Sequence, residues 1–324
     1  MKRVSNNQHS GQGFTIIELL TVMSIIIILI GLLVPSLNRV KRYSMDVKQR
    51  AQFHSIAIAL DLFNAEYDGY PNSDAMDDQP TPQNYCGAMK LAEALVGQDL
   101  KGFNPTSRFR RNGFGTALPT LGMPYPPYNT CGGGLDIACY NENIRSRKMY
   151  LQLENANAYM IKDIYRPADI SAAGYTNHAG FDPNTYVLCD SYNRVTHKAT
   201  GKKIGMPILY YRADSTKLKH PVPADLPAAI NTDIAKQIYN VYDNQDLIDM
   251  GLPWFAGPSH PLASGGGTIA GYTINDFPKK FYDITRDTKI STGDRPVRAD
   301  SYILMSAGFD GEYGTKDDIY NFGD

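Results

Sequence analysis

The chain has 324 residues, of which 43% are hydrophobic and 11% aromatic, which is enough apolar material for a packed core in one large or two small domains. This composition excludes an intrinsically disordered protein. The 32 basic residues nearly balance the 33 acidic ones, so the chain lacks the basic character of nucleic-acid-binding proteins, and we expect no nucleic-acid partner.

The first predicted element is an apolar helix. Residues 14–34 read FTIIELLTVMSIIIILIGLLV, and Glu18 is the only ionisable side chain among them. At about 1.5 Å per residue, a helix of this length just crosses a hydrocarbon core about 30 Å thick. A cleavable signal peptide fits less well, because the apolar run is too long and no small-residue cleavage site follows it. The sequence therefore predicts a transmembrane helix.

Glu18 lies inside this apolar run. A carboxylate within a membrane costs about 2.5 to 3.5 kcal/mol on insertion scales, so Glu18 needs either a partner or a position near the helix end. Cleavage between Gly13 and Phe14 would supply a partner, because it creates a free α-amino group four residues before the acid. Glu18 of one copy would then pair with the amine of a neighbouring copy, in the membrane or in a filament core.

These residues resemble the prepilin-type cleavage and methylation motif shared by type IV pilins and the pseudopilins of type II secretion. In that family a prepilin peptidase cuts after the glycine, here Gly13, and methylates the new N-terminal phenylalanine, here Phe14. Thr15, Glu18 at the fifth mature position and Pro35 at the 22nd also match. The resemblance implies a leader at residues 1–13 and a structural subunit of a type II secretion pseudopilus, which supports protein export.

The resemblance also implies partners and a location. The partners would be other copies and related pseudopilins in a filament, the prepilin peptidase, an inner-membrane assembly platform and membrane lipid. The N-terminus would be cytoplasmic and the head periplasmic, before the subunit enters a pseudopilus or a cell-surface filament. The charge count opposes this orientation, because two basic residues precede the span and five follow it: Lys2 and Arg3, then Arg39, Lys41, Arg42, Lys48 and Arg50. The motif outweighs the count, since cleavage requires a cytoplasmic leader.

The helical pattern continues beyond Pro35. Apolar residues follow at alternating spacings of three and four, as one face of a helix requires: Phe53, Ile56, Leu60, Phe63 and Tyr67. The run Asp68-Gly69-Tyr70-Pro71 then ends the helix. We therefore predict a transmembrane and stem helix at 14–67 and a globular head at 68–324.

The head reads as a mixture of short helices, strands and loops. Short helices are predicted at Met89–Gly97 and Asp243–Met250, and the Pro- and Gly-rich region from about 102 to 134 is predicted to be a surface loop. Strands are predicted at 185–189, 207–212 and 301–306, the first two joined as a hairpin through a turn containing Ala199–Lys202. The expected fold class is α+β, with the long N-terminal helix packed on an antiparallel-sheet head, as in type IV pilins. The segment 187–213 also resembles large pseudopilin-like proteins of planctomycete-type bacteria.

Four cysteines lie beyond the apolar segment: Cys86, Cys131, Cys139 and Cys189. If this part of the chain is exported, disulfides are permitted. Cys131 and Cys139 flank a glycine-rich loop that they could close, which leaves Cys86 with Cys189, but four cysteines allow three pairings. Free buried thiols and zinc are the alternatives, and zinc is disfavoured because no CxxC or HxxxH spacing occurs.

The segment 306–318, SAGFDGEYGTKDD, directly follows the last predicted strand and is the best metal-binding candidate in the head. Hard cations such as Ca²⁺ take several oxygen ligands, and glycines let a short loop turn its carboxylates and carbonyls inward. The candidate ligands are Asp310, Asp317, Asp318 and Ser306. The loop is not an EF-hand, because the sixth position counted from Asp310 is threonine. It resembles the calcium-binding C-terminal loop of major pseudopilins, and a solvated acidic turn is the alternative.

No catalytic signature is present. The chain contains no GxSxG elbow, HExxH helix or P-loop, and its six histidines are scattered, mostly in predicted loops. We therefore expect no enzyme. Two other functions stay open: a type IV pilus subunit for adhesion or motility, and a membrane-tethered binding protein with a pilin-type leader.

Overall fold

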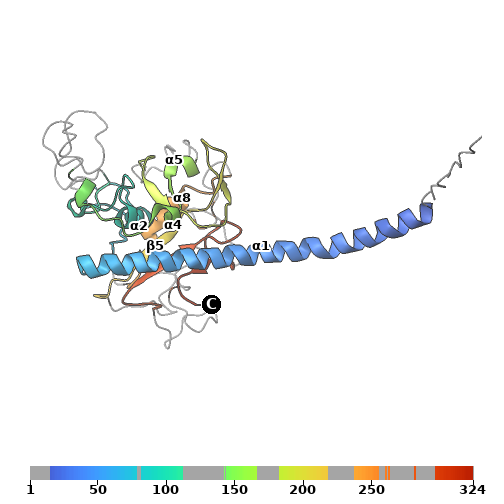
Figure 1. The fold of residues 1–324 in the computed structure, drawn as a ribbon. Helices are drawn as coiled ribbons and strands as arrows, with labels where there is room; N and C mark the ends of the chain where they lie inside the picture. Colours follow the sequence, from blue (N-terminus) through green and yellow to red (C-terminus); the bar gives the residue numbers. More distant parts are fainter. Residues whose placement is uncertain are drawn as a thin grey trace, which may run out of the picture. The chain divides into compact units, whose positions relative to one another are not determined.

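A computed structural model describes residues 15–78, 82–111, 142, 144–165, 182–217, 237–254, 260, 262, 281 and 296–323. The chain divides into two compact units, residues 1–45 and residues 46–324. The helix α1 (Ile16–Tyr67) contributes to both, because its first part lies in the first unit and its second part packs within the second (Figure 1).

α1 is one helix of 52 residues that continues through Pro35. The predicted apolar face beyond Asp46 is confirmed at four positions, which are all buried: Phe53, Ile56, Leu60 and Phe63. Tyr67 is the exception, since it is 37% exposed at the last position of the helix. The helix ends where the sequence predicts, and Asp68 with its positive φ of 53° leads the chain out of it.

The second unit is built from short elements. Its other helical segments are α2 (Gly87–Val96), η1 (Pro105–Ser107), α4 (Leu153–Ala156), α5 (Ile161–Ile164), η4 (Val241–Asn244) and α8 (Gln245–Asp249). Its strands are β1 (Ala158–Met160), β2 (Tyr186–Leu188), β3 (Val195–Thr196), β4 (Lys203–Ile204), β5 (Leu209–Arg212), β6 (Tyr302–Ser306) and β7 (Ile319–Tyr320). The long apolar helix and small antiparallel sheets give an α+β layout.

The strand pairing differs from the prediction. β1 pairs with β2, β3 pairs with β4, and β6 lies between β5 and β7, all antiparallel. The three predicted strands each contain a strand of the structure, and the predicted hairpin between the first two forms in part. Their facing ends meet in an antiparallel bridge between Cys189 and Pro207, beside hydrogen bonds from the Asp190 N–H to the Met206 carbonyl (2.8 Å) and from the Ile208 N–H to the Leu188 carbonyl (2.7 Å). The turn at 199–202 closes the intervening two-residue strands β3 and β4, and beyond the bridge β2 and β5 diverge into different sheets.

Both faces of the β5–β6–β7 sheet are covered. Tyr211 and Ile303 point into one core cluster, which also contains residues of η4 and α8. Tyr210 and Leu304 point into the other cluster, which contains the buried faces of α1 and α2. This alternation follows the period of two in a strand, so the sheet lies between the two core clusters.

Polar contacts also tie α1 to the head. Three side chains of α1 at spacings of three residues each bind the segment Cys189–Tyr192, which follows β2. The pairs are Asp46 Oδ1 with the Tyr192 hydroxyl (2.6 Å), Gln49 Oε1 with the Ser191 N–H (2.8 Å), and Gln52 Nε2 with the Cys189 carbonyl (2.9 Å). Since residues three apart share a helix face, this polar edge aligns α1 with a single segment of the head.

Asp190 lies at the centre of that segment and is fully buried. Its Oδ1 accepts hydrogen bonds from the backbone N–H groups of Tyr192 (3.2 Å) and Met206 (3.1 Å), and its Oδ2 accepts one from the Ser306 hydroxyl (2.8 Å). Burial raises the pKa of Asp190 to about 7, and these hydrogen bonds counter only part of that rise. The carboxyl group therefore joins the end of β2, the chain before β5 and the end of β6.

Replacing Asp190 with asparagine keeps the shape of the side chain and one acceptor oxygen, turns the other oxygen into an NH2 group that can donate to the Ser306 hydroxyl, and removes the ionisation. An acid whose pKa is raised on folding destabilises the native state increasingly as pH climbs from its unfolded to its folded pKa. We therefore expect Asp190→Asn to gain stability relative to wild type between pH 5 and pH 8, by on the order of 2 kcal/mol. Urea unfolding of the full chain in neutral detergent, followed by circular dichroism at several pH values, measures this difference.

The matched control is Asp300→Asn, which changes an exposed acid and should leave the pH dependence of unfolding unchanged. A difference between Asp190→Asn and wild type that stays constant from pH 5 to pH 8 would contradict the raised pKa.

Candidate functional site

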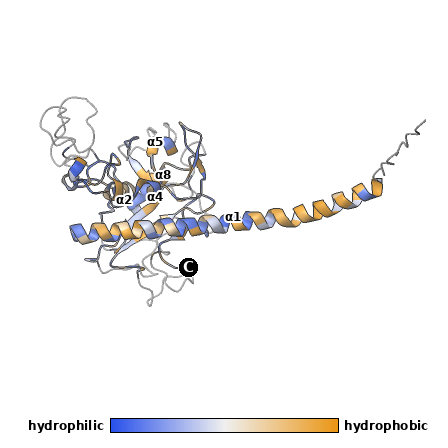
Figure 2. Ribbon diagram, viewed as in Figure 1, coloured by the Kyte–Doolittle hydropathy of each residue, from blue (hydrophilic) through white to orange (hydrophobic). Residues whose placement is uncertain are grey.

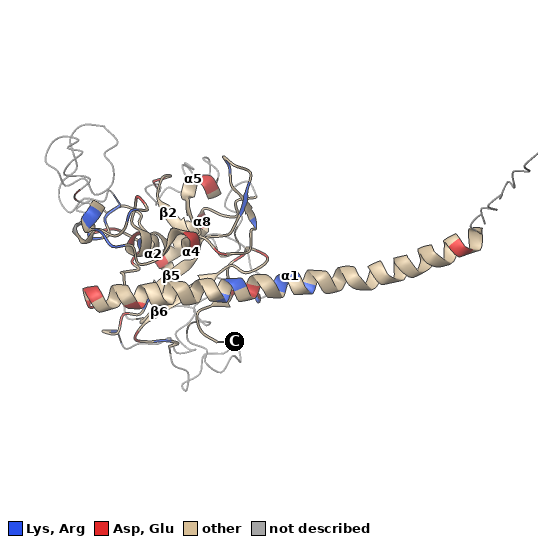
Figure 3. Cartoon of the chain, in the orientation of Figure 1, with Lys and Arg blue, Asp and Glu red and all other residues tan. Residues whose placement is uncertain are grey.

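The first candidate is the apolar part of α1. Residues 15–44 are all exposed, including Ile16 at 80% and Leu32 at 72%. By length and composition, this helix can cross a membrane. Figure 2 shows hydrophobic residues dominating this part of the helix, and Figure 3 shows a long uncharged stretch after one acidic residue near its start.

Glu18 caps the start of α1. Its Oε2 accepts hydrogen bonds from the N–H (2.9 Å) and the hydroxyl (2.8 Å) of Thr15, and the Glu18 N–H donates back to the Thr15 hydroxyl (3.3 Å). This reciprocal pair is a capping box, which satisfies backbone donors that a helix start leaves free. The sequence argument gave Glu18 a partner only in another copy, whereas the structure also gives it one in its own chain. Gly13 and Phe14 lie outside the described residues.

The second candidate is the acidic loop between β6 and β7. Gly308 enters it with a φ of 65°, and a Cβ at this position would lie 2.1 Å from the Asp317 carbonyl oxygen, so only glycine fits. Asp317 closes the loop, because its Oδ2 accepts from the Asp310 N–H (2.9 Å) and its Oδ1 accepts from the Thr315 hydroxyl (2.6 Å). The loop thereby places Asp310 beside Asp317.

The two carboxyl groups influence each other's ionisation. Burial raises the pKa of Asp310 to about 6, and the neighbouring Asp317 carboxylate adds to the rise. Against the opposing effect of burial, hydrogen bonds from Thr315 and Asp310 lower the pKa of Asp317. The pair therefore takes up its first proton more readily on acidification than two separate aspartates would.

The other two predicted metal ligands point elsewhere. The Ser306 hydroxyl donates to Asp190 in the core, and Asp318 Oδ2 accepts from a backbone N–H within the loop at 3.0 Å. Within the described parts of the chain, no three His, Cys, Asp or Glu side chains form a group that could hold a metal ion. Of the four predicted ligands, the structure brings together Asp310 and Asp317.

Cys86 and Cys189 are free, fully buried thiols, so the predicted bond between these two is not formed. Both belong to the same core cluster, where they pack as small apolar side chains. Burial raises the pKa of Cys86 to about 12, and it raises the pKa of Cys189 as well. Because the thiolate is the reactive form, both thiols are inert in this environment. Cys131 and Cys139 lie outside the described residues.

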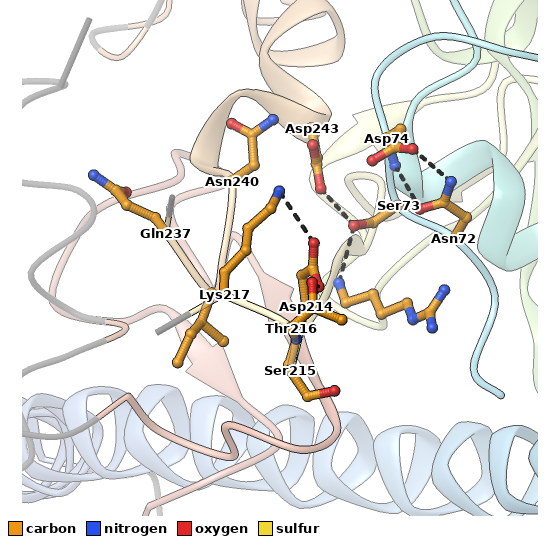
Figure 4. Close-up of a pocket in the computed structure, with 13 residues that line it drawn as sticks. Asn72, Ser73, Asp74, Asp214, Ser215, Thr216, Lys217, Gln237, Asn240 and Asp243 are labelled. Carbon is orange, nitrogen blue, oxygen red and sulfur yellow. Dashed lines mark hydrogen bonds and ion pairs between the residues drawn. The ribbon is translucent and has the colours of Figure 1, made fainter. Parts of the chain in front are cut away.

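A polar cavity of about 230 Å³ is a feature that the sequence did not reveal (Figure 4). Its 13 lining residues come from three separate segments, 72–74, 212–217 and 237–243. None of these segments carries a recognisable motif, and the first falls in a polar stretch that resembles an ordinary loop. Only the folded chain brings them together.

Asp243 is the most buried acid of this cavity, at 2% exposure. It accepts a hydrogen bond from the Ser73 hydroxyl, while Lys217 and Asp214 form an ion pair nearby at 3.1 Å (Figure 4). Burial raises the pKa of Asp243 to about 8, so its carboxyl group is mostly protonated at neutral pH. The cavity offers hydrogen-bond donors and acceptors to a small polar molecule.

Comparison with known proteins adds no relative: no family model, curated protein or solved structure matches the chain. A function therefore has to be argued from α1, the acidic loop and their sequence motifs.

Substitution of Gly308 tests the close approach that shapes the acidic loop. Gly308 and Gly201 have nearly the same φ, 65° and 67°, but a Cβ at Gly201 would meet nothing within 4 Å. Alanine at either position should cost about 1 to 2 kcal/mol for the left-handed backbone, and Gly308→Ala should cost a further 1 to 3 kcal/mol or so for the clash with Asp317. Urea unfolding of both full-length variants measures the difference, and equal losses would contradict the predicted clash.

Proposed function

We propose that the chain is a structural subunit of a type II secretion pseudopilus, held in the inner membrane by α1 before assembly and supporting protein export. The observation that carries the proposal is the exposure of every described residue from 15 to 44 along one apolar helix. The prepilin-type motif at Gly13, Phe14 and Glu18 supports the same proposal from the sequence.

The exposed apolar surface requires a cover. Burying one isoleucine or leucine side chain is worth about 1.5 to 3 kcal/mol, and between Ile16 and Val34 most side chains are of this kind. In a membrane, lipid tails would cover this surface. Once the subunit leaves the lipid, an equally apolar surface must replace them, and the same helix of other copies provides one. A filament with α1 helices in its core satisfies this requirement.

The geometry of Glu18 is compatible with a second partner. Both hydrogen bonds from Thr15 use Oε2, and within the described residues no hydrogen bond reaches Oε1. We propose that the amino group created by cleavage before Phe14 in a neighbouring copy binds Oε1. Such a charge-assisted hydrogen bond would strongly stabilise a carboxylate oxygen in an apolar filament core.

The N-terminus of the mature protein tests the proposal. We expect mass spectrometry of the membrane-bound protein to show a chain that begins at Phe14 with a methylated amino group, because the motif places the peptidase site there. A chain that still begins at Met1, or one cleaved after Pro35, would contradict the proposal.

Processing alone does not separate a pseudopilus from a surface pilus, so the gene is also deleted. Loss of secreted proteins with normal twitching and surface fibres supports the pseudopilus, and the reverse supports the pilus.

We also propose that Ca²⁺ binds the acidic loop at the Asp310–Asp317 pair. Two neighbouring carboxylates are a partial donor set for an ion that takes six to eight oxygens, and loop carbonyls and water would supply the rest. A ligand that binds only the folded state raises the melting temperature. Millimolar Ca²⁺ should therefore raise the melting temperature of the full chain by several degrees, and Asp317→Ala should abolish the rise.

Glu312→Gln is the matched control for calcium, because it removes one charge from the same loop at a side chain outside the pair. It should keep the calcium-dependent rise. If Ca²⁺ does not raise the melting temperature of the wild type, and Mg²⁺ and Ca²⁺ give identical melting curves, the proposed calcium site is wrong.

A further inference from the structure

A group of basic and aromatic side chains follows the apolar part of α1. It consists of Arg39, Lys41, Arg42 and Tyr43, here named the basic collar, and all four residues are exposed, Tyr43 by 71%. Asp46, one turn beyond Arg42, is the first acidic residue after Glu18, so the collar places three basic side chains where the uncharged part of α1 ends. Figure 3 shows these basic residues directly after the uncharged stretch of α1.

The collar has a defined depth relative to the apolar run. At about 1.5 Å per residue, Arg39 lies roughly 7 Å and Tyr43 roughly 13 Å beyond Val34, where the apolar run ends. The headgroup layer of a bilayer is about 5 to 8 Å thick on each side. Side chains of a helix lean toward its N-terminus, so the long stems of Lys41 and Arg42 reach back toward this layer, and their apolar parts can lie along the membrane surface.

The collar also surrounds the helix. At about 100° per residue, Arg39, Arg42 and Tyr43 fall within roughly 100° of one another, and Lys41 points to the opposite side. A single acidic patch on one partner could not contact both sides at once. A layer of anionic headgroups around the helix can, because long basic side chains on either side of the helix reach back into it.

We propose that the basic collar binds the phosphate groups of anionic phospholipids in the leaflet where the apolar run of α1 ends. This inference rests on the proposed membrane anchoring of the chain. The collar would fix the depth of α1 and retain the subunit in the lipid until assembly. It would also help to explain why more basic residues follow the span than precede it. In the proposed orientation these residues lie on the periplasmic side, where the lipid phosphates would give them negative partners.

The experiment is native mass spectrometry of the full chain in neutral detergent with equal amounts of phosphatidylglycerol and phosphatidylcholine. Attraction to an anionic surface is worth about fivefold per basic side chain, so phosphatidylglycerol adducts of the wild type should exceed phosphatidylcholine adducts by tenfold or more. The triple variant Arg39→Gln, Lys41→Gln, Arg42→Gln should bring this ratio close to one. Raising the salt concentration before analysis should weaken the preference of the wild type.

The matched control removes the same charge from an exposed part of the head: Lys198→Gln, Lys202→Gln, Lys203→Gln. It should keep the wild-type preference. An unchanged ratio in the collar variant, or an equal loss in the control, would overturn the proposal. Alkaline extraction from phosphatidylcholine vesicles separates this result from the proposed anchoring. If the wild type and the collar variant both stay in the membrane, the proposed anchoring holds, and the ratio of lipid adducts alone tests lipid binding by the collar. Release of the wild type from the vesicles would overturn both the anchoring and the lipid-binding proposal.

Discussion

The buried Asp190 carboxyl group determines how the described parts of the head meet α1. Its two oxygens hold backbone groups on both sides of the β3–β4 hairpin and the end of β6, which lies 116 residues away. The residues on either side of Asp190 are the ones that bind α1. An apolar residue could fill this volume, but it could not orient three donors from separate segments. A costly buried acid therefore has a structural role here, because it specifies one arrangement of the chain.

This arrangement lets α1 serve two environments with one helix. From residue 15 to residue 44 every described residue of the helix is exposed. After Asp46 one edge carries the polar residues that contact the segment Cys189–Tyr192, and the adjacent face buries aromatic and aliphatic residues against the sheet. A force applied along the axis of α1 would act on these hydrogen bonds and on the packed apolar side chains together. If the chain assembles as proposed, these contacts would transmit the force on α1 to the head.

The sequence predicted elements whose signals are local. The course of α1 follows from its apolar spacing and from the break at Asp68-Gly69, and the strands β2, β5 and β6 follow from runs of β-branched and aromatic residues. The pairing of the strands was not predictable in the same way. β1 is only three residues long and carries no signal, yet it pairs with β2. The expected hairpin partner β5 therefore belongs to another sheet, and the two predicted strands pair only where Cys189 meets Pro207. Ser306 matched a ligand pattern, but its hydroxyl is used by Asp190, which no local pattern marks. The cavity beside Asp243 was missed for the same reason, since its three segments meet only in the folded chain.

Glu18 shows how the structure changes a functional argument from sequence. From the sequence, an acid in an apolar run needs either a partner or a position near the helix end, because an isolated carboxylate in a membrane is costly. The motif Thr15-x-x-Glu18 is also a helix-start signature, and the structure uses it as one. The capping box gives one carboxylate oxygen two hydrogen-bond donors, which offsets part of the cost of this charge in a single copy. Only Oε1 of Glu18 is then left to bind the amine of a neighbouring copy. The proposed pairing would therefore form during assembly, and insertion of the helix into the membrane would not depend on it.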